Sequence, residues 1–249
     1  TLITGAADKL TAIITPENAT NKNIIWTSSK PAVASVSNGE ITAVSAGTAI
    51  ITAKTVDGDY TASCTVTVKA PTIKIKSVKG KAGNSVDIAV ELENNPGIWG
   101  LDAVLSYDKS VMTLKNVTNG TVFDNAAFTM GNLQADSYRL SFENSELQNV
   151  SNSGILAVLS FDIKDTAALG SYPITLTYNS GDIINISEMP VKFDIVNGNL
   201  EVVNVTFGDV TGDGVINKMD ALRLKKYLAG QSVEIDLLAA DVTGDGIVN

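Results

Sequence analysis

The sequence predicts a mainly β chain of several domains that ends in a small helical module. Two observations support this prediction. Short segments of alternating apolar and polar residues, separated by turn residues, recur from the N-terminus to about residue 203. The pattern then changes to an Asp- and Gly-rich motif that occurs twice, with a helical segment between the copies. A chain of 249 residues is long enough for two or three such domains.

The composition narrows the classes of function. Hydrophobic residues make up 44% of the sequence and charged residues 18%, which is typical of globular domains. The formal net charge of −9 makes nucleic acid and anionic membrane surfaces poor partners. No apolar run reaches the roughly 18 residues that span a bilayer. The chain contains no histidine and no convincing pair of catalytic carboxylates, so we predict that it is not an enzyme.

Residues 1–70 are predicted to form the first domain, a β-sandwich. Asn38-Gly39 and Asp57-Gly58 are hairpin signals between short strands. Cys64 is the only cysteine, so no disulfide forms within the chain, and its spacing from Val66 predicts a core position. Trp26 is predicted to point inward in the same way. The expected strands are Leu10–Ile14, Ile24–Thr27, Val33–Val36, Ile41–Val44, Thr48–Ala53 and Ala62–Val68.

This domain resembles the bacterial group 2 immunoglobulin-like domain. The stretches that carry the resemblance are Thr15–Thr20, Trp26–Ala34, Gly39–Ala43 and Ala46–Ala49. The resemblance implies an Ig-like β-sandwich that serves as a passive spacer, with adhesion as the alternative. The first strand of that family is missing before Thr1, and Asn249 falls inside a motif. We therefore expect the chain to be a piece of a longer polypeptide.

Residues 71–204 are predicted to form a second, larger β domain after a short break at Ala70–Thr72. Its pattern fits a single sandwich or jelly roll. The segment Ile155–Ile163 is apolar on both faces, as expected of a strand buried between two layers. The other expected strands are Val86–Leu92, Gly100–Ser106, Tyr138–Phe142 and Tyr172–Tyr178.

The second domain resembles the cohesin family. The resemblance rests on Gly83–Val90, Asn95–Asp108, Ser141–Asn144 and the strand around Leu156. It implies a jelly roll in which one sheet face binds a dockerin module of another protein. By motif, Asp102 accepts hydrogen bonds from that partner, and Ser141 and Asn144 lie near the following recognition strand. The alternative is that Asp102 is an ordinary solvent-facing residue.

The C-terminal part contains a repeated Asp-Val-Thr-Gly-Asp-Gly motif, at 209–214 and 241–246. Its spacing is that of an EF-hand-type calcium loop, in which oxygen atoms surround the ion and a glycine allows the sharp turn. The predicted ligands of the first loop are Asp209, Thr211, Asp213, the backbone carbonyl of Val215, Asn217 and Asp220. Those of the second loop are Asp241, Thr243, Asp245, the backbone carbonyl of Ile247 and Asn249. The second loop stops before its last ligand position, so we expect it to bind calcium weakly or to stay empty.

A helix is predicted over 219–229, with Gly230 ending it, whereas Val202–Thr206 before the first loop is strand-like. A loop followed by one helix and a second loop resembles the dockerin family over residues 207–249, and we place this module at 205–249. The resemblance implies that the helix meets a cohesin through a stripe of Lys218, Met219, Leu222, Lys225 and Lys226. Ala221, Leu224 and Leu228 are expected to pack inward. A basic stripe that is merely solvated is the alternative.

Together these features predict a non-catalytic adaptor that links proteins of an extracellular, cell-surface-associated complex for polysaccharide degradation. Its cofactor would be Ca²⁺. Its partners would be a dockerin-bearing protein at the cohesin-like domain and a cohesin-bearing protein at the dockerin-like module. The basic stripe and the acidic receptor residues Asp102, Glu143 and Glu146 favour encounter between copies, but we expect a monomer because charge alone contributes little affinity. The alternatives are a carbohydrate-binding surface protein, although aromatic residues are only 6%, or a non-catalytic ancillary region of a secreted glycoside hydrolase.

Overall fold

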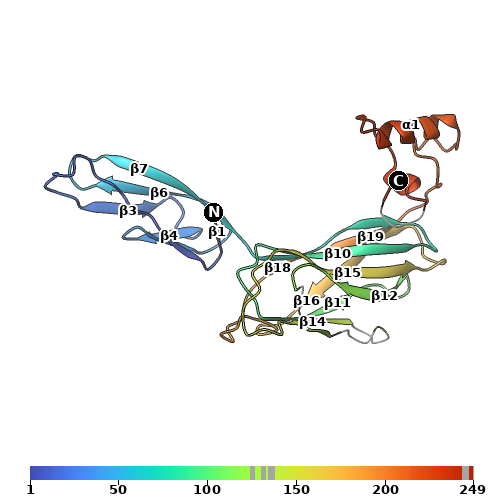
Figure 1. Cartoon of the computed structure of the whole chain (residues 1–249), viewed down its shortest axis with the longest axis horizontal. Coiled ribbons are helices and arrows are strands. Elements are labelled where there is room, and N and C mark those ends of the chain that lie inside the picture. Colours follow the sequence, from blue (N-terminus) through green and yellow to red (C-terminus); the bar gives the residue numbers. More distant parts are fainter. Residues whose placement is uncertain (124–126, 130–132, 134–137, 243–246, 249) are drawn as a thin grey trace. The chain divides into compact units, whose positions relative to one another are not determined.

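The computed structural model describes residues 1–123, 127–129, 133, 138–242 and 247–248 (Figure 1). The chain divides into two compact units. The first contains residues 1–72 with 93–97 and 192–194, and the second contains 73–92, 98–191 and 195–249. Both units are built from β-sheets, and the two helices lie at the end of the second unit. The predicted fold class, mainly β with a small helical C-terminal part, is confirmed.

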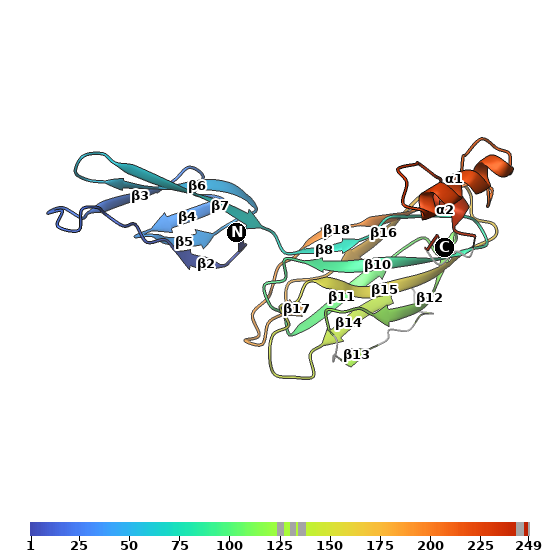
Figure 2. The same ribbon diagram turned by 45° about the horizontal axis from the view of Figure 1, so that its top comes forward.

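The N-terminal unit is a two-layer β-sandwich, as the turned view shows (Figure 2). One sheet has the order β1-β7-β6-β3 and the other has the order β2-β5-β4. The first sheet comprises β1 (Leu2–Ile3), β7 (Thr61–Lys69), β6 (Gly47–Thr55) and β3 (Ile24–Ser28). The second comprises β2 (Ala7–Lys9), β5 (Glu40–Ala43) and β4 (Ala34–Ser37).

Period-two alternation fills the core between these sheets. The buried residues are Ala34, Ile41, Ala43, Ala49, Ile51, Val66 and Val68, and Trp26 packs against them. The predicted hairpin at Asn38-Gly39 joins β4 and β5 with φ of 50° and 84° at these two residues. A Cβ on Gly39 would lie 2.5 Å from the Leu10 carbonyl oxygen, so this turn also depends on the absence of a side chain.

The predicted core position of Cys64 is wrong, because the structure exposes this residue. Cys64 does share its side of β7 with the buried Val66 and Val68. Its register partner Ile51 on β6 is fully buried, so the sheet is covered at this level one strand further in. On its other side β7 is paired with β1 only at Val68 and Lys69, so at Cys64 it is an edge strand and the side chain stays exposed.

The second unit is a larger sandwich of two sheets, with the orders β12-β15-β10-β8-β18 and β13-β14-β11-β16-β19-β9; β17 pairs with β11. The first sheet comprises β12 (Met112–Asn119), β15 (Gly154–Ile163), β10 (Ser85–Glu93), β8 (Thr72–Ile75) and β18 (Asp194–Val196). The second comprises β13 (Ala127–Thr129), β14 (Tyr138–Glu143), β11 (Gly100–Ser106), β16 (Gly170–Thr177), β19 (Gly198–Val202), β9 (Val78–Gly80) and β17 (Ile183–Ile184).

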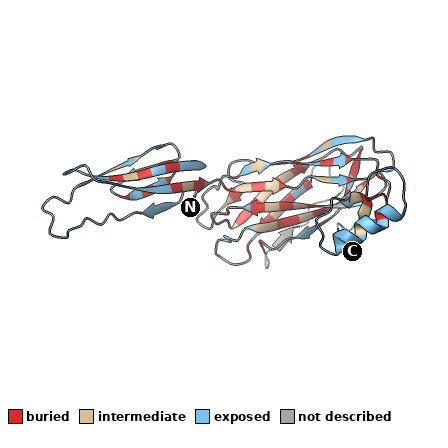
Figure 3. Ribbon diagram, turned by 90° about the horizontal axis from the view of Figure 1, so that it is seen from above, coloured by how far each residue is buried: buried red, intermediate tan, exposed pale blue. Residues whose placement is uncertain are grey.

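The core of this sandwich is apolar and aromatic, and Figure 3 shows it as bands of buried residues along the strands. Phe123 stacks on Phe142 with ring centroids 5.6 Å apart, and Tyr107 meets Phe161 edge to face. β15 lies inside its sheet between β12 and β10, but only one of its faces is fully buried. The prediction that both faces are buried is therefore wrong: Val158, Ser160 and Asp162 are partly exposed.

The C-terminal module follows β19 almost directly. Val203 N donates to the Gly80 carbonyl oxygen at 2.9 Å, and residues 203–206 form no strand, contrary to the prediction. Helix α1 (Lys218–Leu228) ends close to the predicted position, with φ of 73° at Gly230. A short helix, α2 (Leu237–Ala240), precedes the second motif and was not predicted. Among the described residues, no helix combines the length and apolar character needed to cross a membrane.

Candidate functional site

The predicted receptor residues lie on the outer face of the β14-β11-β16 sheet. The register pairs Asp102 on β11 with Ser141 on β14, so these two side chains are neighbours on one side of the sheet. Leu101 and Phe142, which alternate with them, are buried in the core. We call the outward side chains of these three strands the receptor face; they are Asp102, Val104, Ser106, Arg139, Ser141, Glu143, Ser171, Pro173, Thr175 and Thr177.

The two oxygens of the Asp102 carboxylate have different surroundings. Oδ2 forms an ion pair with Nη1 of Arg139 at 3.5 Å. The Asp102 side chain is 38% exposed and the Arg139 side chain is 57% exposed. Oδ1 is buried and accepts no hydrogen bond from any described residue. A buried oxygen without a donor is unfavourable, and a partner's donor reaches Oδ1 only after the Asp102 side chain turns outward.

Asn144 does not belong to this face. It is only 8% exposed, its Nδ2 donates to the Gln148 carbonyl oxygen at 2.9 Å, and its Oδ1 accepts from Glu146 N. The side chain therefore holds the loop after β14 in shape. The amide is thus used inside the domain, and the contact of Asn144 with a partner stays a prediction. Trp99 Nε1 donates to the Glu146 carbonyl oxygen and fastens the same loop.

The first acidic loop is organised around the carboxylate of Asp209. Asp209 accepts hydrogen bonds from Gly212 N at 2.9 Å, Asp213 N at 3.2 Å and Gly214 N at 2.8 Å. The chain can turn this sharply because Gly212 and Gly214 have φ of 73° and 87°. The residue is 7% exposed, so the loop closes over the carboxylate.

The carboxylate of Asp220 closes the same loop from the helix. It accepts from Thr211 N at 3.0 Å, from Thr211 Oγ1 at 2.8 Å and from Asn217 N at 2.8 Å. The hydrogen bonds from Asn217 and Thr211 lower the pKa of Asp220 below its usual value, against the opposing effect of burial. Asn217 Oδ1 in turn accepts from Met219 N, so Asn217 and Asp220 form a capping box that starts α1.

The oxygen atoms of this loop fit a hard cation such as calcium. Thr211 Oγ1 lies 3.3 Å from Asp209 Oδ1 and 2.8 Å from Asp220 Oδ1, so three predicted ligands converge. The other two predicted side-chain ligands bond within the loop instead. Asp213 Oδ1 accepts from Val215 N, and Asn217 Nδ2 donates to the Val215 carbonyl oxygen. The described residues contain no cluster of three carboxylates, so hydroxyl and carbonyl oxygens would have to complete the ligand set.

The second acidic loop is described only at its ends. Asp241 is 8% exposed and follows α2, whereas Ile247 is 59% exposed. Thr243, Asp245 and Asn249 lie outside the described residues. The structure therefore places two of the five predicted ligands of this loop.

Helix α1 separates its side chains into two sides. Asp220 is its one buried residue and Leu224 is half-buried. The five predicted stripe residues are all exposed on the opposite side of the helix; they are Lys218, Met219, Leu222, Lys225 and Lys226. The prediction that Ala221 and Leu228 pack inward is wrong: both are exposed, and Leu228 is 50% exposed, because no described element covers this side of the helix.

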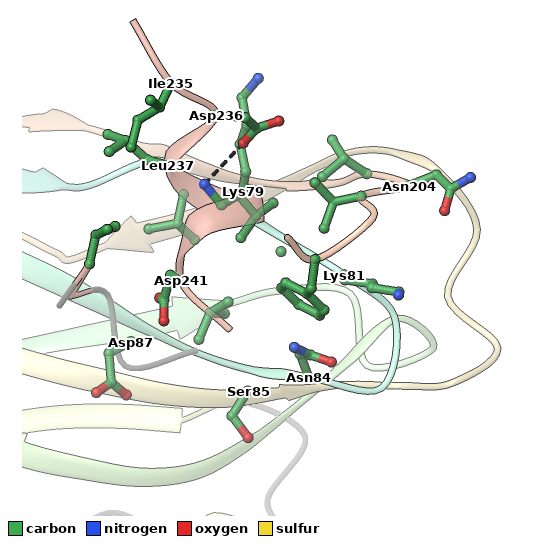
Figure 4. A pocket seen from close by; sticks show the side chains of 18 of the residues that line it. Lys79, Lys81, Asn84, Ser85, Asp87, Asn204, Ile235, Asp236, Leu237 and Asp241 are labelled. Atoms are coloured by element: carbon green, nitrogen blue, oxygen red, sulfur yellow. Dashed lines mark hydrogen bonds between the residues drawn. The ribbon is translucent and has the colours of Figure 1, made fainter. Parts of the chain in front are cut away.

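A groove of about 860 Å³ is lined by β9, the start of β10 and the C-terminal module (Figure 4). The charged side chains that line it already have partners. Lys79 pairs with Glu201 at 3.3 Å, Lys81 Nζ lies 5.1 Å from the centre of the Phe207 ring, and Asp236 caps α2. The groove is thus a seam within the second unit, and we assign no ligand to it.

Three family models match the chain, in the predicted order. The bacterial Ig-like domain (group 2) matches residues 1–66, the cohesin domain matches 71–182, and the dockerin type I domain matches 207–249. The resemblances stated from the sequence are thereby confirmed in kind and in order.

Relatives of known name match parts of the chain. Cellulose-binding protein A of Clostridium cellulovorans is 24% identical over 168 residues, which are 64% of this chain and 9% of that protein. An alpha-L-arabinofuranosidase of Bifidobacterium longum is 37% identical over 111 residues, 44% of this chain and 10% of that enzyme. The chain thus spans a tenth or less of the length of these relatives.

Among solved structures, the sixth cohesin of Acetivibrio cellulolyticus scaffoldin B, in complex with a Cel5 dockerin, is similar with a TM-score of 0.50 and 22% identity. The match covers 54% of this chain and all of that cohesin. At this level of identity the similarity supports the jelly-roll fold of the second unit.

Sequence reasoning missed Arg139 on the receptor face. The signal was available, since Arg139 lies two residues before Ser141 on the same strand and therefore faces the same side. What the sequence could not supply was the pairing of β11 with β14 that brings Arg139 to Asp102.

Proposed function

We propose that this chain, in which an Ig-like segment, a cohesin segment and a dockerin type I segment follow one another, is a non-catalytic adaptor. Its receptor face would bind a dockerin module of one protein, and helix α1 would bind a cohesin of another. The proposal rests on the presence, on one chain, of a cohesin segment and a dockerin type I segment. We call the cohesin segment the receptor, and we call a dockerin module that binds such a receptor a plug. The matched segments are all non-catalytic modules, which agrees with the absence of histidine and of a catalytic carboxylate pair from the sequence.

The geometry supports a direct role for Asp102 and Ser141 in the receptor. They are neighbours on an exposed sheet face, and Asp102 Oδ1 lacks a donor. A plug that supplies this donor would form a charge-assisted hydrogen bond, which is among the stronger polar contacts. Ser141 is half-exposed and can donate or accept.

We propose Ca²⁺ as the cofactor of the C-terminal module, held by the first loop through Asp209, Thr211, Asp213, the Val215 carbonyl oxygen, Asn217 and Asp220. Dockerin type I domains bind calcium, and the converging oxygens of Asp209, Thr211 and Asp220 are of the type that calcium prefers. The ion would neutralise the carboxylates and draw in Asp213, so that the loop and the first turn of α1 are fixed together. The second loop, beginning at Asp241, would bind more weakly.

The setting we propose is an extracellular complex that degrades polysaccharides, in which the Ig-like segment acts as a spacer. The similarity to cellulose-binding protein A supports this setting. The test is a binding screen in which the calcium-loaded chain is presented to immobilised dockerin modules and, separately, to immobilised cohesins. Retention on both kinds of resin supports an adaptor. Retention on the cohesin resin alone supports a chain that binds partners only through its C-terminal module.

A second candidate is that the chain is a non-catalytic ancillary region of a glycoside hydrolase. The similarity of 111 residues to an alpha-L-arabinofuranosidase favours it. Sequencing the gene on both sides of this segment separates the two candidates, because only the second requires a catalytic domain in the same polypeptide.

A further inference from the structure

We propose that Arg139 decides which plug the receptor face accepts. It favours a calcium-loop helix that places a carboxylate opposite it, and it excludes one that places a lysine there, including helix α1 of a second copy of this chain. The inference rests on the proposed function of the receptor face and names the chemistry of its partner.

Arg139 is the single cation among the described side chains that face outward on β11, β14 and β16. It lies opposite Val104 in the register and next to Asp102, at 3.5 Å between Nη1 and Oδ2. Its guanidinium is 57% exposed and presents several N–H donors in a fixed planar arrangement, so a partner's carboxylate can reach the donors that Asp102 leaves free.

The ion pair changes what the receptor face presents. From the sequence, Asp102, Glu143 and Glu146 suggest an acidic region that would attract a basic plug. In the structure, Asp102 is paired with Arg139, and Glu146 lies in the loop beyond β14, where it accepts a hydrogen bond from Gln148 Nε2. Glu143 is then the one outward carboxylate on β11 and β14 with no ion pair among the described residues. What remains at Asp102 is an acceptor without a donor, Oδ1, which a partner reaches only after the side chain turns outward, beside a cation. A matching plug therefore needs a neutral donor, such as a hydroxyl, next to an acidic side chain.

Helix α1 of this chain has the opposite pattern. Its exposed stripe carries Lys218, Lys225 and Lys226 and no acidic residue, and Arg223 lies on the adjoining side of the helix. A lysine of this stripe that falls opposite Arg139 meets a like charge, and like charges across an interface are unfavourable. Arg139 thus gives a physical reason for the expectation that the chain stays monomeric although it carries both a receptor and a plug.

The competing interpretation is that Arg139 merely forms a surface ion pair, which contributes little to anything. The chain offers a matched control for this. Lys115 pairs with Asp162 at 3.1 Å on the other sheet, and Lys115 is 58% exposed where Arg139 is 57% exposed. Reversing either charge changes the net charge of the protein equally, but only one of the two residues lies on the receptor face.

The experiment is sedimentation velocity of the whole chain at micromolar concentration, with and without calcium. The wild-type chain should be a monomer. Arg139→Glu should associate in calcium at least about tenfold more tightly than wild type, Arg139→Gln should lie between, and Lys115→Glu should remain a monomer. Adding Lys225→Glu and Lys226→Glu to Arg139→Glu should abolish the association. Thermal melting of each variant checks that it is folded, as expected for exposed positions.

Three results overturn the inference: association of the wild type as tight as that of Arg139→Glu, no association of Arg139→Glu, or equal association of Lys115→Glu. A parallel screen of immobilised dockerin modules separates these from failure of the proposed function. Suppose that a dockerin binds the wild type, that Asp102→Ala weakens this binding, and that Arg139→Glu does not change the preference between acidic and basic dockerin modules. The proposed function of the receptor face is then supported and the role of Arg139 is refuted. If no dockerin binds and no variant associates, both fall.

Discussion

Replacing Asp209 by alanine should destabilise the first loop even when calcium is absent. Its carboxylate accepts from the backbone N–H groups of Gly212, Asp213 and Gly214 at 2.8–3.2 Å. Gly212, Asp213 and Gly214 are exposed, so water can take over as acceptor. Each hydrogen bond then contributes at the low end, about 0.5–1 kcal/mol, and three of them give about 1.5–3 kcal/mol of local stability.

Asp213→Ala is the matched control. This residue is a predicted calcium ligand in the same loop, but its carboxylate accepts one hydrogen bond among the described residues, from Val215 N at 2.9 Å. In calcium-free buffer the substitution should cost only about 0.5–1 kcal/mol. With calcium, both variants lose a carboxylate ligand and both should bind the ion more weakly.

Hydrogen exchange of the α1 amides in EDTA measures the first effect, and calorimetric titration with calcium measures the second. Protection of α1 should fall markedly more in Asp209→Ala than in Asp213→Ala. Equal protection in the two variants would refute the reasoning that the Asp209 network shapes the loop by itself. Unchanged calcium binding in both would refute the assignment of the loop as a calcium site.

The remaining predictions concern pH, the receptor face, the free thiol and catalysis. Hydrogen bonds from Asn217 and Thr211 lower the pKa of Asp220 in the folded protein from its ordinary value of 3.8. The stabilisation by the Asp220 carboxylate is therefore complete above pH 3.8 and is lost as the pH falls through the pKa of the folded state. Circular dichroism of the calcium-free chain should show α1 melting in that acidic range, and a helix unaffected by acid would contradict this. Asp102→Ala should weaken the binding of a verified dockerin partner by about 1–3 kcal/mol, measured by calorimetry. Unchanged affinity would show that the interface does not include Asp102. Cys64 should react with a thiol reagent in the folded protein as fast as in the unfolded one, since it is exposed; slow labelling would restore its predicted core position. Incubation with polysaccharides should release no sugar, and any turnover by the purified chain would contradict the non-catalytic assignment.

Local sequence was sufficient where the structure is local. The Asp-Val-Thr-Gly-Asp-Gly motif specifies both the turn and the start of α1, because Asp209, Asn217 and Asp220 bond to backbone groups a few residues away. Period-two alternation likewise predicted the inward and outward sides of β11 and β14. The side of a strand follows from the sequence because successive side chains point in opposite directions.

Sequence reasoning failed where the outcome depends on what lies opposite. Alternation placed Cys64 on the correct side of β7, but it could not tell that β7 is an edge strand at this residue, where β1 no longer pairs with it. The same limit applies to Ala221 and Leu228, whose side of α1 is uncovered among the described residues. Asn144 looked like a surface residue of a recognition strand, yet it is buried because the loop after β14 folds back onto it. The first two outcomes depend on which distant segments lie next to the residue, and the third depends on how a local loop folds back.

The parallel pairing of β9 with β19 has a mechanical consequence. β9 stands near the start of the jelly roll and β19 at its end, and the two run side by side through Val78 and Leu200, Lys79 and Glu201, and Gly80 and Val202. Tension pulling these strands from opposite ends slides them along each other, so their hydrogen bonds are strained together rather than opened one at a time. β1 and β7 of the N-terminal unit are paired in the same sense. Under such shear, rupture requires many contacts to break at once, which slows forced unfolding, a rate-controlled process. A chain held between two partners would thus unfold most slowly when the force acts along these parallel strands.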